Sequence, residues 1–113
     1  MINTVDTAVA FGYEIAEYFL SVEYPKGLYN LYVLYSRRKL RKILKKRTGY
    51  KLSKNDWNYL RHCLDKHVID CEREGPLGGM SSVPVRFDIS GRKLRVGLQV
   101  CVYQEKEKYY SEN

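Results

Sequence analysis

The chain has 113 residues, a formal net charge of +7 at pH 7 and 44% hydrophobic residues, with 11 tyrosines and 3 cysteines. This length suffices for one domain with a modest core, and the composition argues against a disordered chain and a disulfide-rich secreted scaffold. No apolar run approaches the roughly 20 residues that a membrane span requires, and the first residues lack the pattern of a signal peptide. We therefore expect a cytoplasmic protein with reduced cysteines that does not enter a membrane.

The positive charge is concentrated in one segment. Residues 36–54 hold ten Lys and Arg and no acid, whereas residues 1–35 carry a net charge of −3 and residues 55–113 are close to neutral. Charge of one sign in one segment predicts a polyanionic partner such as DNA, RNA or an anionic membrane surface. The alternative is a helix whose charged face is simply solvated. Ten basic residues without a single acidic one favour binding of a polyanion over a solvated face.

The first predicted element is a helix over residues 5–20. Gly12 lies on its apolar stripe, which predicts a close contact with another element at a small cost in helix propensity. A Pro-Lys-Gly sequence at residues 25–27 then breaks the chain. Residues 27–35 are rich in Tyr and Val, which favours a short strand, although a helix that continues into the basic segment fits the same pattern. The apolar stripe consists of Val5, Ala8, Gly12, Ile15, Ala16 and Phe19.

A second helix is predicted over residues 37–47. Ser36 suits the N-cap because its hydroxyl can accept a hydrogen bond from a free N–H group of the first turn, and Gly49 suits the C-cap region. Lys and Arg crowd the last turn, where the helix dipole favours cations. The predicted buried stripe is Leu40, Ile43 and Leu44, and the cations Arg38, Arg41, Lys42 and Lys45 lie on the opposite face.

A third helix begins after Ser53 and is predicted to run to about residue 69. Ser53 and Asp56 nearly match a capping box, and Leu52 and Trp57 occupy the two positions of a hydrophobic staple. The negative charge of Asp56 also suits the positive end of the helix dipole. Trp57, Leu60, Leu64 and Val68 form an apolar stripe, and the opposite face carries Asn55, Asn58, Tyr59, His62 and Lys66.

Residues 70–82 contain a Gly-Pro-Leu-Gly-Gly run and are predicted to form a long loop. Residues 83–103 alternate between apolar and polar positions on both sides of Gly91-Arg92, which predicts an antiparallel β-hairpin with a two-residue turn of type II′. Pro84 predicts that the first strand lies at a sheet edge, because proline cannot donate to a ladder. The predicted register pairs Ile89 with Leu94, Phe87 with Val96, Val85 with Leu98, Val83 with Val100, and Asp88 with Arg95.

This order of helix, strand, helix, short turn, helix and β-hairpin resembles the winged helix-turn-helix superfamily, a broad group of mostly DNA-binding domains. We expect an α+β fold with three helices and a C-terminal antiparallel hairpin, forming a single domain over residues 1–103, with a flexible polar tail at residues 104–113. The resemblance implies that the helix after Ser53 is the recognition helix, which would enter the major groove. Residues 37–47 would then form the supporting helix, and Gly91-Arg92-Lys93 the tip of the wing.

The polar and cationic residues of these elements are the candidate contacts with DNA. Cations bind phosphate oxygens without reading the sequence, whereas Asn suits a bidentate contact with adenine. For the cations and for the polar residues alike, the alternative to DNA contact is an ordinary solvated surface. The candidate phosphate contacts are Arg37, Arg38, Arg41, Lys42, Lys45, Lys54, Arg92 and Lys93, and the candidate base contacts are Asn55, Asn58, Tyr59 and His62.

Metal binding and catalysis receive little support from the sequence. Cys63, His67 and Cys71 are spaced by four, but three such positions on one helix span about 12 Å, which is too far for one zinc ion. The chain also lacks a phosphate-binding loop, a nucleophile elbow and a metalloprotease helix. Asp88 has a predicted partner in Arg95 across the hairpin. We expect no cofactor, no metal and no enzymatic activity.

Three functional hypotheses follow. The first is a protein that binds double-stranded DNA, acting as a small transcriptional regulator or a DNA-associated accessory factor, as a monomer or a homodimer. The second is a protein-interaction module, such as a small inhibitor encoded by a virus or mobile element, whose basic segment meets an acidic protein partner. The third is RNA binding, because charge alone does not distinguish the two nucleic acids.

Overall fold

The computed structural model describes residues 2–26 and 31–99. Its α+β fold confirms the predicted class, and the sheet has four strands among these residues instead of a hairpin with one further short strand. Along the chain the elements are α1 (Val5–Tyr18), a π-helical turn (Phe19–Glu23), a 3-10 turn (Tyr24–Lys26), β1 (Tyr32–Tyr35), α2 (Arg37–Thr48), α3 (Lys54–Leu64), β2 (Val68–Glu74), β3 (Met80–Ser90) and β4 (Lys93–Leu98).

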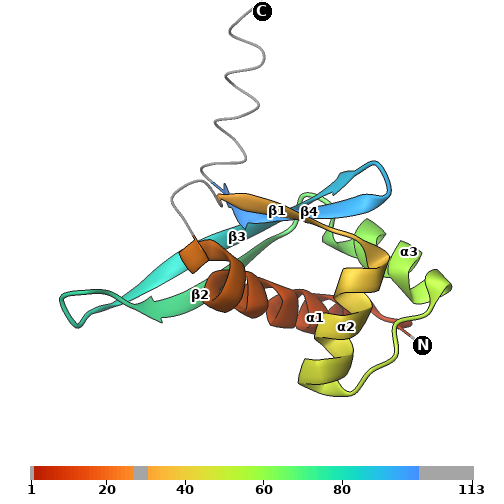
Figure 1. Ribbon diagram of the computed structural model, residues 1–113, viewed down its shortest axis with the longest axis horizontal. Coiled ribbons are helices and arrows are strands. Elements are labelled where there is room, and N and C mark those ends of the chain that lie inside the picture. Colours follow the sequence, from red (N-terminus) through yellow and green to blue (C-terminus); the bar gives the residue numbers. More distant parts are fainter. Residues whose placement is uncertain (1, 27–30, 100–113) are drawn as a thin grey trace, which may run out of the picture.

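The strands form one antiparallel sheet in the order β1-β4-β3-β2. Figure 1 shows the three helices on one side of this sheet, with α1 lying along β2 and with α2 and α3 near the end of the sheet that carries the β3–β4 turn. The core fills the space between the helices and the sheet, because each contributes one apolar face. Its fully buried side chains include Ile15, Phe19, Leu40, Leu44, Leu60, Leu64, Phe87, Leu94 and Val96.

The first helix is confirmed, but α1 ends at Tyr18, and the last two predicted residues belong to the π-helical turn. Thr4 caps α1 by accepting a hydrogen bond of 3.1 Å from the amide of Thr7. The predicted apolar stripe is buried except at Val5, which is 56% exposed in the first turn. Gly12 lies against α3 and β2, since a Cβ placed there would lie 2.7 Å from Cδ2 of Leu64 and 3.0 Å from Cδ1 of Ile69. The predicted close contact at Gly12 is therefore confirmed.

The capping predictions for the other two helices are confirmed as well. The Ser36 hydroxyl accepts a hydrogen bond of 3.2 Å from the amide of Lys39, and Gly49 ends α2 in the left-handed region at φ 77°. Ser53 and Asp56 form a full capping box at the start of α3. The staple residues Leu52 and Trp57 are both buried, at 2% and 5% exposure.

The third helix is shorter than predicted and ends at Leu64. Lys66 adopts a left-handed conformation at φ 63°, and its amide donates a hydrogen bond of 2.7 Å to the carbonyl of Phe87. The amide of Phe87 in turn donates to the carbonyl of His67 at 2.9 Å. These bonds turn the chain out of the helix and into the sheet. Val68, predicted to complete the helical stripe, is therefore the first residue of β2.

The predicted loop over residues 70–82 is wrong, because β2 and β3 form a second hairpin there. Only residues 75–79 make the turn, which is closed by a hydrogen bond of 2.7 Å from the amide of Gly75 to the carbonyl of Gly79. The flanking residues pair across the hairpin, from Glu74 opposite Met80 to Cys71 opposite Val83. Cross-strand backbone bonds thus order a polar segment that has weak strand propensity of its own.

The register of the β3–β4 hairpin is confirmed at four predicted pairs, which are Ile89–Leu94, Phe87–Val96, Val85–Leu98 and Asp88–Arg95. Gly91 has φ 58°, as the first position of a type II′ turn requires. The predicted Val83–Val100 pair, residues 27–30 of the predicted strand and the tail at residues 104–113 lie outside the described residues. Most of the apolar face is buried, whereas Ile89 is 39% exposed.

The prediction that Pro84 marks an edge strand is wrong, since β3 lies between β4 and β2. Pro84 stands opposite Asp70 of β2, one residue beyond the Val85–Leu98 pair. None of the β3–β4 pairs described by the structure involves Pro84. Its missing N–H group is therefore tolerated at a position where β3 extends beyond its described partner on β4.

Candidate nucleic-acid interface

Two adjoining clefts lie on the α2 and α3 side of the molecule. The turn cleft, of about 640 Å³, lies between the start of α2, the exposed side of α3 and the β3–β4 turn. The α2 cleft, of about 390 Å³, follows the outer face of α2 to the connector before α3. Arg38 lines both clefts. The turn cleft is lined by Ser36, Arg37, Arg38, Lys54, Trp57, Asn58, Arg61, Arg92 and Lys93, and the α2 cleft by Arg38, Arg41, Lys42, Lys45, Lys51 and Leu52.

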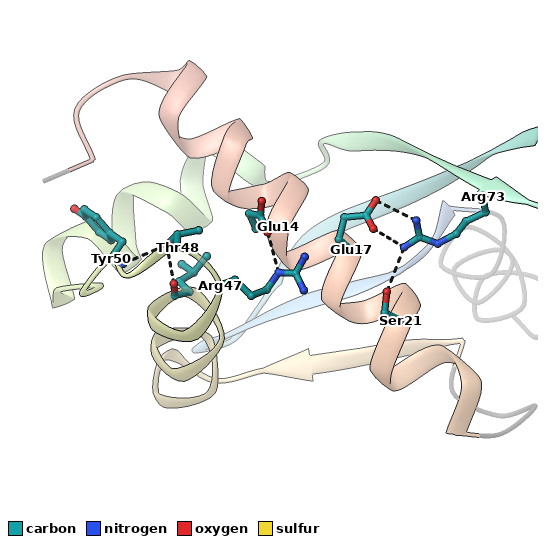
Figure 2. Close-up of polar contacts among 8 residues, drawn as sticks. Glu14, Glu17, Ser21, Arg47, Thr48, Tyr50 and Arg73 are labelled. Atoms are coloured by element: carbon teal, nitrogen blue, oxygen red, sulfur yellow. Dashed lines mark hydrogen bonds and ion pairs between the residues drawn. The ribbon is translucent and has the colours of Figure 1, made fainter.

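Ten of the lining residues are Lys or Arg, and the lining contains no acid. Ion pairs are found elsewhere on the described chain, at Lys26–Glu23, Arg47–Glu14, Arg73–Glu17 and Arg86–Asp88. Figure 2 shows two of them tying α1 to α2 and to β2. Cations at the clefts are therefore uncompensated within the described chain, and concave surfaces lined by one sign of charge concentrate the positive potential.

Helix α2 sets the spacing of the α2 cleft. Its buried side, centred on Leu40, Ile43 and Leu44, fixes the opposite side toward solvent. Arg38 and Lys45 stand seven residues apart on that outer side, or about 10 Å along the axis at 1.5 Å per residue. The positive end of the helix dipole lies at Ser36 and Arg37, which line the turn cleft, so the backbone adds to the positive potential there.

A network centred on the buried carboxylate of Asp56 fixes the start of α3. Asp56 accepts hydrogen bonds from the amide of Ile2 at 2.8 Å, the Tyr50 hydroxyl at 2.7 Å and the amide of Ser53 at 3.3 Å. Burial alone would raise the pKa of Asp56, but these hydrogen bonds outweigh it and lower the pKa to about 2. Burial and the bond to Asp56 raise the pKa of Tyr50 to about 12. The first turn of α3 is thus fixed by an ionised carboxylate that accepts several hydrogen bonds.

Arg61 joins α3 to the β3–β4 turn, and sequence reasoning did not select it. Its guanidinium lies over the Trp57 ring, with Cζ 5.2 Å from the ring centroid, and donates a hydrogen bond to the carbonyl of Gly91. Directly after the end of α3, Oδ1 of Asp65 accepts a hydrogen bond of 2.9 Å from the amide of Ile89. The spacing of Trp57 and Arg61 by four residues was the available signal, since such pairs meet on a helix surface.

The structure brings all eight predicted phosphate contacts to the two clefts. Of the predicted base contacts, only Asn58 lines a cleft; Asn55 and His62 are exposed on α3 beside it. Tyr59 is half-buried against the core. Its hydrogen bond with the Cys63 thiol raises the pKa of Tyr59, so its hydroxyl already has a partner within α3. The structure thus groups the predicted cations more closely than the predicted base contacts.

The described residues provide neither a membrane-spanning helix nor a metal-binding cluster. None of the helices described is long and apolar enough to cross a membrane. Among the same residues, no three His, Cys, Asp or Glu side chains are placed to hold a metal ion. Cys71 is buried, and this burial raises the pKa of its thiol to about 11, which keeps it protonated and unreactive at neutral pH.

Comparison with known proteins found no matching family model, no matching curated protein and no matching solved structure. The function of the chain is therefore inferred from its own chemistry. Its most specific feature is the pair of cationic clefts that meet at Arg38.

Proposed function

We propose that the protein binds double-stranded DNA through the two clefts and the adjoining face of α3, as a small transcriptional regulator or a DNA-associated accessory factor. The observation that carries the proposal is the set of ten Lys and Arg side chains lining two clefts that share Arg38. Such clustering of uncompensated charge lowers the free energy of unfolding, because like charges repel each other in the folded protein. Release of counterions from a nucleic-acid backbone offsets that cost on binding.

The lining of the clefts favours a duplex over a single strand. Proteins that hold single-stranded nucleic acids stack the bases on exposed aromatic side chains. Trp57 is the single aromatic residue of the lining; it is only 5% exposed, and the Arg61 guanidinium lies over its ring. A lining of cations without an exposed aromatic suits a sugar–phosphate backbone whose bases remain paired.

The dimensions agree with this mode of binding. The distance of about 10 Å from Arg38 to Lys45 along α2 corresponds to about three phosphates, which follow each other every 3.4 Å along the axis of a duplex strand. A backbone lying in the clefts would bring the adjoining groove to the outer face of α3, where Asn55, Asn58 and His62 are exposed. The β3–β4 turn lies next to α3, where the winged-helix resemblance requires the wing.

The test compares two double variants that remove the same charge. Arg38→Ala/Lys45→Ala removes cations from the clefts, whereas Lys26→Ala/Lys39→Ala removes one cation paired with Glu23 and one that extends over the Tyr18 ring. Fluorescence anisotropy with a labelled duplex, repeated over a salt series, is expected to show a slope of log affinity against log salt that falls by about 2 in the cleft variant. The control variant is expected to keep most of the slope. Equal slopes in the two variants would contradict the proposal.

A competition experiment separates duplex DNA from the other polyanions. Unlabelled duplex DNA, single-stranded DNA, duplex RNA and polyglutamate are added to the labelled complex at equal charge and fixed salt. We expect duplex DNA to compete at the lowest concentration. Stronger competition by RNA or by polyglutamate would instead favour the RNA-binding or the acidic-partner hypothesis.

A further inference from the structure

We infer that Arg61 is a positioning residue, which holds the β3–β4 turn against α3 and thereby keeps Arg92 and Lys93 at the turn cleft. The inference rests on the proposed function, because it concerns how the same site presents its charges. Neither the spacing of the cations in the sequence nor the winged-helix resemblance identifies this residue. It follows from the contacts between α3 and the turn.

The turn is tied to α3 at two points. Arg61 donates to the carbonyl of Gly91, the first residue of the turn, and Asp65 accepts from the amide of Ile89, the residue two positions earlier. The first tie comes from the last turn of α3, and the second comes from Asp65, the residue that directly follows the helix. Together they fix both the position and the direction of the turn relative to the helix.

Arg61 is itself held in place. Its guanidinium lies over the ring of Trp57, which is 5% exposed and belongs to the core. A planar guanidinium can stack on a ring and donate in its own plane at the same time, whereas the ammonium of lysine has no plane. The core therefore positions Trp57, Trp57 positions Arg61, and Arg61 positions the turn.

This tie is needed because of the charges around it. Arg92 and Lys93 are exposed at the tip of a two-residue turn and line the same cleft as Arg38 and Lys54. Repulsion between these cations favours movement of the turn away from the cleft. A turn fixed by Arg61 presents its two cations in one geometry before a phosphate backbone arrives, which lowers the entropic cost of binding.

The conservative variant Arg61→Lys tests the inference, because it keeps the charge and removes the planar donor. In the salt series we expect its affinity for the labelled duplex to fall about tenfold and its slope to fall by about 1 to 2, as contacts from Arg92 and Lys93 are lost. Arg47→Lys is the matched control, because it makes the same exchange at an arginine that pairs with Glu14 and lines neither cleft. Its affinity is expected to stay within about twofold of the wild type.

A second background separates positioning from direct contact. In Arg92→Ala/Lys93→Ala, the added Arg61→Lys change is expected to lower affinity less than about twofold, because the cations that Arg61 positions are already gone. If Arg61→Lys lowers the affinity by the same factor in this background as in the wild type, Arg61 contacts the duplex directly, and the inference is overturned. Wild-type affinity for Arg61→Lys alone would overturn it as well.

A measurement without DNA distinguishes a failure of this inference from a failure of the proposed function. The backbone ¹⁵N heteronuclear NOE values of Arg92 and Lys93 report motion of the turn on the picosecond to nanosecond scale. They are expected to fall in Arg61→Lys and to stay high in Arg47→Lys. If they fall while the wild type binds no duplex, the positioning role stands and the DNA proposal fails. If they do not change, Arg61 does not hold the turn.

Discussion

The amide of Ile2 donates a hydrogen bond of 2.8 Å to Oδ1 of Asp56, which lies 54 residues later in the chain. The bond joins the segment before α1 to the capping box of α3 and helps to keep the carboxylate ionised. One buried group therefore serves both the packing of the N-terminal segment and the start of the helix that borders the clefts. Its removal is expected to affect both.

Asp56→Asn is expected to destabilise the fold by about 2 to 4 kcal/mol, because the amide group can accept only part of the hydrogen bonds that the carboxylate receives and leaves buried donors without partners. Urea denaturation at neutral pH measures the change. Asp6→Asn is the control, because Asp6 is an exposed acid in the first turn of α1 and is expected to cost less than about 1 kcal/mol. Equal losses in the two variants would contradict the role of Asp56.

The stability of the wild type is expected to decrease in acid through Asp56. Its pKa of about 2 in the fold lies below its ordinary value of 3.8, so the carboxylate binds protons more readily in the unfolded chain. The contribution, of about 2 kcal/mol, is present above pH 4 or so and is lost as the pH falls toward about 2. Urea midpoints over this range test it. The difference between the wild type and Asp56→Asn is expected to shrink by that amount in acid.

Alanine is expected to be tolerated differently at three glycines. A Cβ at Gly97 would lie 2.5 Å from Cβ of Tyr32 and 2.6 Å from the carbonyl oxygen of Leu31, neither of which can move independently of β1. At Gly12 the nearest atom is the end of the Leu64 side chain, at 2.7 Å. We expect Gly97→Ala to cost more than about 3 kcal/mol and Gly12→Ala about 1, after the gain in helix propensity. Thermal denaturation measures both, and Gly79→Ala, with open space around it, is the control.

The Arg73–Glu17 ion pair is expected to stabilise the fold more than Arg47–Glu14. Arg73 donates two bonds to the Glu17 carboxylate, at 2.6 and 3.2 Å, and these bonds lower the pKa of Glu17. The Arg47–Glu14 pair has a single bond of 2.8 Å, and the Glu14 side chain is 33% exposed against 17% for the Glu17 side chain. Double-mutant cycles to Ala are expected to give about 1 kcal/mol for the first pair and less than about 0.5 for the second. A reversed order would contradict the geometric argument (Figure 2).

Loss of the polar face of α3 is expected to act differently from loss of the cations. Asn55→Ala/Asn58→Ala/His62→Ala removes hydrogen-bonding groups and leaves every cation that lines the clefts. We expect it to leave the salt slope unchanged and to reduce any difference in affinity between duplexes of different sequence. Selection from a random duplex library, by the wild type and the variant in parallel, measures this difference. If the wild type and the variant select the same sequences, the polar face of α3 does not contribute to sequence recognition.

The sequence predicted the parts of the fold that local chemistry determines. Ser53 and Asp56 determine where α3 begins, and the alternation around Gly91 determines the β3–β4 register, because a shift by one residue would expose Phe87 and separate Asp88 from Arg95. Both signals are complete within a few residues. The eight cations were selected from their charge and from their predicted places on the two helices and at the hairpin tip. Their meeting at two clefts follows from how α2 and the turn pack on α3.

The parts that sequence reasoning missed depend on partners far away in the chain. Neither Gly nor Pro marks the end of α3, where Lys66 turns the backbone and bonds to Phe87. The residues of β2 include several acids, which disfavour strands in isolation, and they become a strand through pairing with β3. Arg61 is one cation among many until the fold brings Gly91 to it.

The placement of charge also has a kinetic consequence. Cations remote from the clefts, such as Arg47 and Arg73, are matched by acids, whereas those at the clefts are not, in the part of the chain that the structure describes. The centre of positive charge is thus displaced from the centre of mass, and the field of a polyanion exerts a torque on the tumbling molecule. This torque turns the cationic side of the molecule toward the polyanion over distances up to the Debye length, about 10 Å at moderate salt. If the clefts bind a polyanion as proposed, encounters from many starting orientations are expected to lead to binding, and added salt is expected to slow association more than it speeds dissociation.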